Sequence, residues 1–280
     1  MTSNSSSDVF SFESEDGSLV YRDAGAGRPV VLLHSVFVDH TMFDAQFADL
    51  AQRFRVIAPD ARGHGGSANA SKPFRATDDL AALLRHLELE PAVLVGTSMG
   101  ALIAVDTALE HPELVRGLVV AGRGTGNPDL TDPWARSVHE AQSRAMAAGD
   151  IPSWIDAWVR WAAGPQRTVD QVDPAIVARL REMVIRTLSK HTPDETDHTV
   201  AVQNVCTRAK EIAVPVLGIY GDLDAPGLIE TLERLMSVVP NGDTVAMEGT
   251  AHYPTMERPE VFNRLVEDFL VEIYSSSAEG

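Results

Sequence analysis

The sequence predicts an α/β fold, with a mostly parallel central sheet flanked by helices and a helical cap inserted into the chain. Short, continuously apolar runs alternate with amphipathic stretches through the first 123 residues. A long stretch without strand-like runs follows, and the strand pattern returns towards the C-terminus. Unbroken apolar strands indicate a parallel sheet whose two faces are both covered by helices.

Four strand candidates lie before the inserted stretch, and helical spacing of apolar residues separates them. This spacing predicts helices over residues 42–53, 76–89 and 99–110. The strand candidates are Pro29–His34, Phe54–Asp60, Ala92–Gly96 and Val115–Gly122.

The inserted stretch reads as helical throughout. Asp-Pro pairs at Asp132 and Asp173 are typical of helix starts, because the carboxylate caps free N–H groups and proline suits the first turn. Strand candidates return at Val214–Gly221 and Asp243–Gly249, and a last helix is predicted over 259–274. The predicted division is a core of residues 1–123 and 208–280 and a cap of residues 124–207.

Composition excludes several classes of partner. The chain has 280 residues, of which 44% are hydrophobic and 22% charged, as in globular proteins. The formal net charge of −17 argues against nucleic acid, which needs a basic surface, and against anionic membranes. No apolar run approaches the roughly 18 residues of a membrane span. The expected partner is a small-molecule substrate, and a homodimer is left open.

Cysteine usage and motif content bear on the compartment and on cofactors. The one cysteine, Cys206, excludes an internal disulfide, which fits a reducing compartment. The first ten residues lack the apolar segment of a secretory signal, so a cytoplasmic location is expected. No metal-ligand spacing, phosphate-binding loop or dinucleotide fingerprint occurs, and therefore neither a metal nor a cofactor is expected.

The stretch VLVGTSMGALIAV, from Val93 to Val105, places a polar Ser98 between two apolar runs. The first run is strand-like and the second is helix-like, so Ser98 stands on a sharp turn at the carboxyl edge of the sheet, where ligands bind. Gly96 and Gly100 leave room for the crowded backbone. This G-x-S-x-G pattern predicts a nucleophile elbow with Ser98 as the nucleophile.

A serine nucleophile needs a general base, and the base needs an orienting acid. In proteins with this elbow, the acid and then the histidine follow the serine along the chain. The segment GIYGDLDAPG offers Asp222 and Asp224, and we prefer Asp224 because it lies further from the strand end and can reach across. His252, in EGTAHYPTMERP after the next strand, is the predicted base.

Five segments together resemble the α/β-hydrolase superfamily: LLHS, DARGHGGS, GTSMG, GDLD and AHYPTMERPEVFNRLVEDFL. Within it, HSVFVDHTMFDAQF and RVIAPDARGHGGS are most similar to the 3-oxoadipate enol-lactonases and cofactor-free haloperoxidase-like esterases. The resemblance implies an oxyanion hole formed by the backbone N–H groups of Val36 and Met99. It also implies a structural role for His64 and a supporting role for His34 in the oxyanion loop. One departure is Ser35, where many members have glycine.

The cap and nearby core residues are candidates for the substrate-binding surface. Trp154, Trp158 and Trp161 share one helix face, which fits either packing of the cap on the core or an apolar wall for a substrate. Arg123 follows a strand end and either meets a substrate carboxylate or pairs at the edge of the cap. The candidate substrate-binding residues are Phe37, Met42, Arg123, Trp134, Trp154 and Trp158.

These predictions combine into a serine hydrolase that cleaves a small to medium apolar carboxylic ester or lactone through an acyl-enzyme. Three alternatives stay open: C–C bond hydrolysis, perhydrolysis on the same triad, and a ligand-binding receptor with slow residual turnover. Epoxide and haloalkane hydrolysis are disfavoured, because those chemistries use an aspartate where this chain has Ser98.

Overall fold

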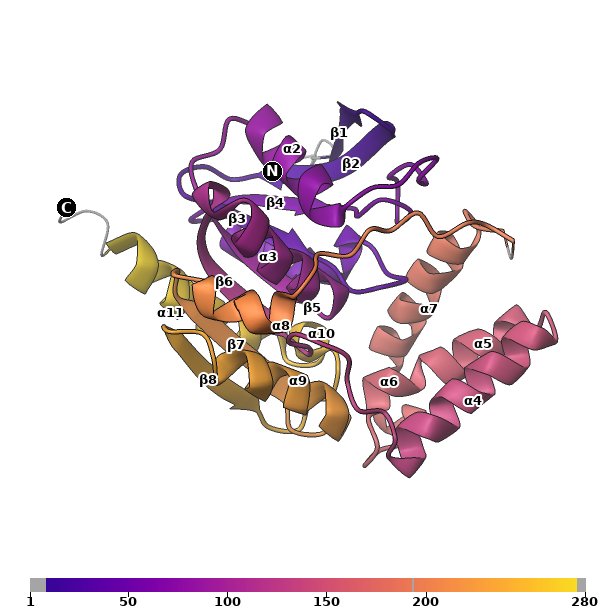
Figure 1. Ribbon diagram of the computed structural model, residues 1–280. Helices are drawn as coiled ribbons and strands as arrows, with labels where there is room; N and C mark the ends of the chain where they lie inside the picture. The colour runs from indigo at the N-terminus through magenta and orange to yellow at the C-terminus, as the bar shows by residue number, and fades with distance from the viewer. Residues whose placement is uncertain (1–8, 193, 276–280) are drawn as a thin grey trace, which may run out of the picture.

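The computed structural model describes residues 9–192 and 194–275, and an eight-stranded sheet forms its centre (Figure 1). The strand order is β1-β2-β4-β3-β5-β6-β7-β8, and only β1 and β2 pair antiparallel with their neighbours. This confirms the predicted α/β fold with a mostly parallel sheet. The strands are β1 (Val9–Ser14), β2 (Gly17–Ala24), β3 (Pro29–Leu33), β4 (Arg55–Pro59), β5 (Ala92–Thr97), β6 (Val115–Ala121), β7 (Val216–Gly221) and β8 (Gly242–Met247).

Helices connect the parallel strands, and short 3₁₀ turns accompany them. The ends of the predicted core, residues 1–8 and 276–280, lie outside the described residues. The core helices are α1 (Asp44–Leu50), α2 (Ala76–His86), α3 (Met99–Glu110), α9 (Pro226–Met236), α10 (Pro254–Glu257) and α11 (Pro259–Ser275). The core 3₁₀ turns are η1 (His40–Phe43), η2 (Pro112–Leu114) and η4 (Ala209–Glu211).

The hairpin of β1 and β2 was not predicted. Its first strand is mostly exposed, and only two residues of β2, Leu19 and Tyr21, are buried. A strand that is covered on few positions carries no continuous apolar run, which is the signal that revealed the buried strands.

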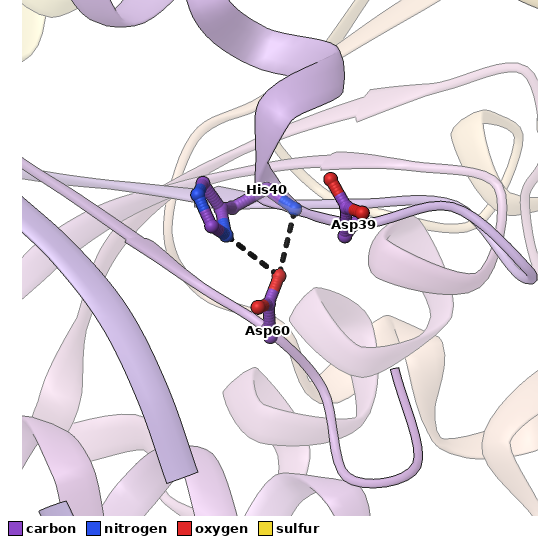
Figure 2. A group of neighbouring side chains, drawn as sticks. All are labelled: Asp39, His40 and Asp60. Atoms are coloured by element: carbon purple, nitrogen blue, oxygen red, sulfur yellow. Dashed lines mark hydrogen bonds and ion pairs between the residues drawn. The ribbon is translucent and has the colours of Figure 1, made fainter. Parts of the chain in front are cut away.

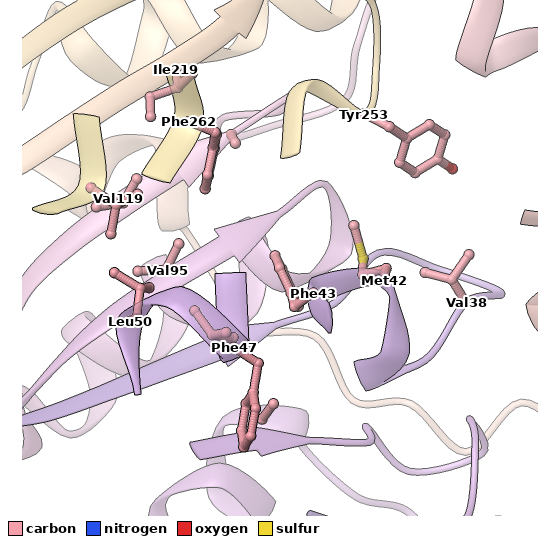
Figure 3. Close-up of a cluster of buried hydrophobic side chains, with 14 of the residues drawn as sticks. Val38, Met42, Phe43, Phe47, Leu50, Val95, Val119, Ile219, Tyr253 and Phe262 are labelled. Carbon is pink, nitrogen blue, oxygen red and sulfur yellow. The ribbon is translucent and has the colours of Figure 1, made fainter. Parts of the chain in front are cut away.

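Alternate residues of the buried strands face two separate hydrophobic clusters. In β5, Val93 and Val95 pack in the cluster that includes side chains of α1 and α11, such as Phe47 and Phe262 (Figure 3). Leu94 points to the opposite face, where α2, α3 and α9 cover the sheet. The sheet is therefore rigidly held from both sides, and its carboxyl edge is a fixed platform for the loops that follow the strands.

The residues of the predicted cap form helices beside the sheet (Figure 1). Asp132, Asp150 and Asp173 each accept hydrogen bonds from backbone N–H groups in the first turn of a helix, as expected for N-caps. Gly149 and Gly164 have positive φ angles of 66° and 71° and end helical stretches. The elements are α4 (Pro133–Ala147), α5 (Ile151–Trp158), α6 (Arg160–Ala163), η3 (Val169–Gln171), α7 (Pro174–Leu188) and α8 (Val205–Arg208), the last of which continues into the core.

None of the helices within residues 9–192 and 194–275 combines the length and the apolar character that crossing a bilayer requires.

Candidate active site

Ser98 occupies a strained turn between β5 and α3. Its backbone has φ 54° and ψ −109°, a conformation that costs about 1–3 kcal/mol and that the surroundings must impose. A Cβ atom on Gly96 would lie 2.2 Å from the carbonyl oxygen of Gly100, and one on Gly100 would lie 1.9 Å from the carbonyl oxygen of Leu33. Both glycines are therefore sterically required, as the pattern predicted.

The loops after β7 and β8 bring Asp224 and His252 together. Nδ1 of His252 lies 2.9 Å from Oδ2 of Asp224, and both side chains are buried. The other carboxylate oxygen accepts a hydrogen bond of 2.7 Å from the N–H of Ala225. Because a carboxylate only accepts hydrogen bonds, Nδ1 carries the imidazole proton, and Nε2 of His252 is left as a proton acceptor.

Asp222, the other candidate acid, has a different role. Its Oδ1 accepts a hydrogen bond of 2.7 Å from the N–H of Gly249 on the exposed turn after β8. Asp222 thus ties two loops together at the surface, while Asp224 reaches His252.

The end of β6 lies between Ser98 and His252. The carbonyl of Ala121 accepts a hydrogen bond of 2.8 Å from the N–H of Ser98. The next residue, Gly122, packs on the imidazole, since a Cβ atom there would lie 3.3 Å from Nδ1 of His252. One peptide thus contacts both residues, which brings the predicted nucleophile and the predicted base to the same point of the sheet edge.

His34 holds the loop after β3 in place. Its Nε2 accepts a hydrogen bond of 2.9 Å from the N–H of Ala61, so its Nδ1 is protonated and donates to the carbonyl of Ser35 at 2.8 Å. Burial lowers the pKa of His34 and keeps the ring neutral. Two hydrogen bonds of one buried ring therefore fix the start of the predicted oxyanion loop.

The two predicted oxyanion donors lie at a helix start and in a loop. Met99 is the first residue of α3, where the N–H has no partner within the helix. Phe37, directly after Val36, adopts a positive φ of 63° that turns the loop. Within the described part of the chain, neither the N–H of Val36 nor that of Met99 donates to a protein acceptor.

Aromatic side chains from the cap contact the residues around His252. The ring of Trp161 lies 6.4 Å from that of His252 and 5.0 Å from that of Trp134. Tyr253 lies 5.2 Å from His252 and 6.1 Å from Trp158, with distances measured between ring centroids. Trp161 was predicted only as part of a possible apolar wall on one helix face with Trp154 and Trp158, but α5 ends at Trp158 and Trp161 lies on α6. Tyr253 was not among the candidate substrate-binding residues. Tyr253 follows His252 directly in the chain, which was the available signal.

The remaining candidates divide between two places. Phe37 contacts Trp154 and Trp158 edge to face, with centroid distances of 5.0 and 6.3 Å. Met42 is buried in the same cluster, and its sulfur accepts a hydrogen bond from the N–H of Ser35. Arg123 lies elsewhere, in a pocket beside α3 that none of these aromatic residues lines. Its contact with a substrate carboxylate stays a prediction.

His64 lies in the loop after β4 and stays neutral. Burial lowers its pKa to about 3, and its Nδ1 lies 3.1 Å from the carbonyl oxygen of Arg62. The guanidinium of Arg62 forms two hydrogen bonds, of 2.7 and 2.8 Å, with the carboxylate of Asp79. These contacts fix the loop, in keeping with the structural role that the resemblance implies.

Asp39, His40 and Asp60 offer possible metal ligands within 4.8 Å of one another (Figure 2). Each ligand atom already has a protein partner, however. Oδ1 of Asp60 accepts hydrogen bonds from the backbone N–H and from Nδ1 of His40, both at 2.8 Å. Burial alone would raise the pKa of Asp60, but its bonds with His40 hold it below the usual value. Asp39 pairs with Arg186 of α7 at 2.7 Å. The cluster therefore anchors the loop after β3.

Comparison with known proteins adds the family. The model of a family described as "Alpha/beta hydrolase family" matches residues 30–265. The chain is 27% identical over 270 residues to 3-oxoadipate enol-lactonase 2 of Acinetobacter baylyi, covering 92% of this chain and 97% of that protein. It is 28% identical over 281 residues to a 2-hydroxy-6-oxononadienedioate/2-hydroxy-6-oxononatrienedioate hydrolase of Cupriavidus pinatubonensis, covering 91% of this chain and 93% of that protein.

A solved structure agrees with these relatives. The enol-lactonase from Burkholderia xenovorans LB400 matches with a TM-score of 0.71 and 25% identity, over 93% of this chain and 99% of that one. The family match runs from β3 into α11, and it includes the elbow and the loops that carry Asp224 and His252. With its mostly parallel sheet and the residues at the sheet's carboxyl edge, this chain belongs to the alpha/beta hydrolase family.

Proposed function

We propose that this protein is a serine hydrolase that cleaves a small to medium apolar carboxylic ester or lactone. The observation that carries the proposal is the 2.9 Å contact between His252 and Asp224, beside a serine held on a strained elbow. A base oriented by a buried acid, next to a nucleophile on a strand–helix turn, is the arrangement that acyl transfer by serine requires.

The reaction has two halves. The Ser98 hydroxyl attacks the carbonyl carbon while Nε2 of His252 takes its proton, and the ionised Asp224 stabilises the imidazolium that forms. The tetrahedral oxyanion is held by the N–H groups of Val36 and Met99, each of which contributes about 10²- to 10³-fold in rate. His252 then protonates the leaving alcohol. In the second half, water attacks the acyl-enzyme with His252 as base and releases the acid.

The aromatic side chains of the cap support the proposal of an apolar substrate. Rings of Trp158 and Trp161 contact the residues beside His252, and Phe37 links the loop after β3 to the same aromatic cluster. Sites of mostly apolar surface with a few polar groups suit small hydrophobic ligands. The enol-lactonase among the relatives acts on a lactone by its name, which is consistent with the proposed class.

Hydrolysis of a panel of nitrophenyl esters and simple lactones tests the proposal. We expect turnover by the wild type and a fall of about three or more decades in Ser98→Ala. Ser237→Ala, at an exposed serine on the C-terminal side of α9, is the matched control and should keep wild-type rates. Turnover by Ser98→Ala at the wild-type rate would contradict the proposal.

One alternative reaction has support from a relative. The Cupriavidus relative is named as a hydrolase of 2-hydroxy-6-oxo dienedioates, and the same triad would serve a C–C cleavage of a diketone. Labelling of Ser98 by a serine-directed phosphonate, together with turnover of a vinylogous diketone and of no ester, would favour this alternative. Neither turnover nor labelling would favour a ligand-binding receptor.

A further inference from the structure

A pocket of about 410 Å³ lies beside α3, and no residue of the proposed triad lines it. Leu102 and Asp106 of α3 form one wall, and Arg123 and Gly126 form another. Cys206 of α8 closes it from the side of the chain that returns from the cap. We call this space the Arg123 pocket. Its volume lies within the range of small-molecule sites.

Arg123 is largely buried in this pocket and has no acidic partner. Within residues 9–192 and 194–275, its guanidinium forms no ion pair, and its only hydrogen bond runs from Nη2 to the carbonyl oxygen of Gly126 at 3.3 Å. Its Nε is buried and lacks a hydrogen-bond acceptor. Burial lowers the pKa of Arg123, yet an arginine keeps its charge in proteins. A buried cation without a counter-ion is costly, so the pocket is incomplete without an anion.

A second guanidinium, that of the exposed Arg234 on α9, lies next to Gly126 in the wall of the pocket, although Arg234 does not itself line the pocket. Nη1 of Arg234 lies 3.1 Å from the point where a Cβ atom on Gly126 would stand, and Sγ of Cys206 lies 3.0 Å from that point. Arg234 likewise forms no ion pair with any acidic residue that the structure describes. Two unpaired arginines thus meet at Gly126 in a protein whose formal net charge is −17.

Asp106 lies in the wall of the pocket formed by α3 and opposes an anion only weakly near neutral pH. Burial and, to a smaller extent, the nearby Glu110 raise its pKa, Arg75 and Arg208 lower it, and the net effect is a pKa of about 7. Near pH 7 the carboxyl is therefore protonated in a large fraction of molecules. A protonated carboxyl also donates a hydrogen bond, which an anionic oxygen can accept.

We propose that the Arg123 pocket binds a small oxyanion, a carboxylate or a phosphate group, between Arg123 and Arg234. Guanidinium groups match the two oxygens of such anions through charge-assisted hydrogen bonds. This site is separate from the ester-binding site of the proposed function, and its occupation does not depend on turnover. It is nevertheless one helical turn from the elbow, since the N–H of Leu102 donates to the carbonyl oxygen of Ser98.

The lone cysteine makes the pocket measurable without any activity assay. Cys206 is exposed and is the one thiol of the chain, so its rate of labelling by the neutral reagent N-ethylmaleimide reports on the pocket alone. We expect sodium acetate or inorganic phosphate to slow labelling saturably at constant ionic strength, with sodium chloride as the reference salt. Stronger protection by acetate would identify a carboxylate site, and stronger protection by phosphate would identify a phosphate site.

Charge variants test the residues that the pocket uses. Arg123→Gln should raise the half-protecting concentration about tenfold, the loss expected when one charge-assisted hydrogen bond is removed. Arg234→Gln, at an exposed position that tolerates substitution, should act in the same direction, and Asp106→Asn should lower the concentration. Arg144→Gln, on the cap helix α4 where the arginine is exposed, is the charge-matched control and should change nothing.

Three results would overturn the proposal. The first is protection by chloride equal to that by acetate and phosphate. The second is unchanged protection in both arginine variants. The third is competitive inhibition of ester hydrolysis at the protecting concentration, because that would put the anion in the catalytic cavity. A protein inactive on every ester would leave the labelling result intact, so failure of the proposed function and failure of this site are distinguishable.

Discussion

At the carboxyl edge of the sheet, the proposed catalytic residues are held by close backbone contacts and by a hydrogen bond between side chains, whereas the tryptophans of the cap contact their neighbours through ring packing. Gly100 approaches the carbonyl of Leu33 so closely that no side chain fits, and His252 is bonded to a carboxylate. In the cap, Trp161 touches Trp134 and the His252 ring through aromatic contacts alone. Backbone contacts tolerate almost no change, while ring packing can rearrange. Under the proposed function, we therefore expect the sheet edge to carry the chemistry and the cap to select the substrate.

Two contacts join the cap to the sheet edge. Gly164, at the end of α6, abuts the loop before Asp224, since a Cβ atom there would lie 2.0 Å from the carbonyl oxygen of Leu223. Arg167 pairs at 2.7 Å with Glu257, whose other oxygen accepts the N–H of Ala251 just before His252. The helices of the predicted cap are thus fastened next to the loops that carry Asp224 and His252.

Replacing Asp224 tests the sheet edge most strongly. Asp224→Asn should lower kcat about 10⁴-fold, because an amide can donate to Nδ1 and then leaves the imidazole proton on Nε2, where the base must be free. Asp222→Asn is the matched control and should stay within about threefold, since its amide oxygen still accepts the N–H of Gly249. Steady-state kinetics on the best ester measure both. Equal losses in the two variants would refute the assignment of Asp224.

Alanine substitution of one glycine in each region compares the two regions through the free energy of unfolding. Gly100→Ala should lower the free energy of unfolding by at least about 3 kcal/mol, because its methyl group would lie 1.9 Å from the Leu33 carbonyl oxygen. Gly149→Ala, in the cap, should cost about 1 kcal/mol from its positive φ alone, since nothing lies within 4 Å of its Cβ position. Urea unfolding checks both values. A larger loss at Gly149 than at Gly100 would reverse the comparison.

The sequence predicted the sheet edge better than the cap, and the reason is physical. Ser98 and Asp224 follow the buried strands β5 and β7, His252 follows the mostly exposed strand β8, and the parallel strands of one sheet bring their carboxyl ends to one edge. Local spacing therefore contains most of that geometry. The contact of Trp161 with His252 depends instead on how a separate group of helices docks, which no local pattern encodes.

The same difference between local patterns and contacts of distant segments explains which other features the sequence did not predict. The hairpin of β1 and β2 has too few buried positions to show a continuous apolar run. Arg123 was visible at the end of a strand, but the pocket that it shares with Cys206 joins segments that are far apart in the chain. The observed boundaries of the buried elements lie close to the predicted ones, because strong burial gives these elements a clear apolar pattern.

The smallest expected effect concerns the cap, and it separates the roles of the cap and the sheet edge most sharply. Trp161→Leu should change the preference between long and short acyl esters about tenfold, the discrimination that a few methylene contacts in an apolar site provide. Trp134→Leu should change it less, because Trp134 contacts Trp161 and is not in ring contact with His252. Values of kcat/KM across a series of acyl lengths measure the preference. If Trp161→Leu slowed every ester equally, the shortest included, then Trp161 would position His252 rather than select the acyl chain, and the cap would belong to the catalytic machinery.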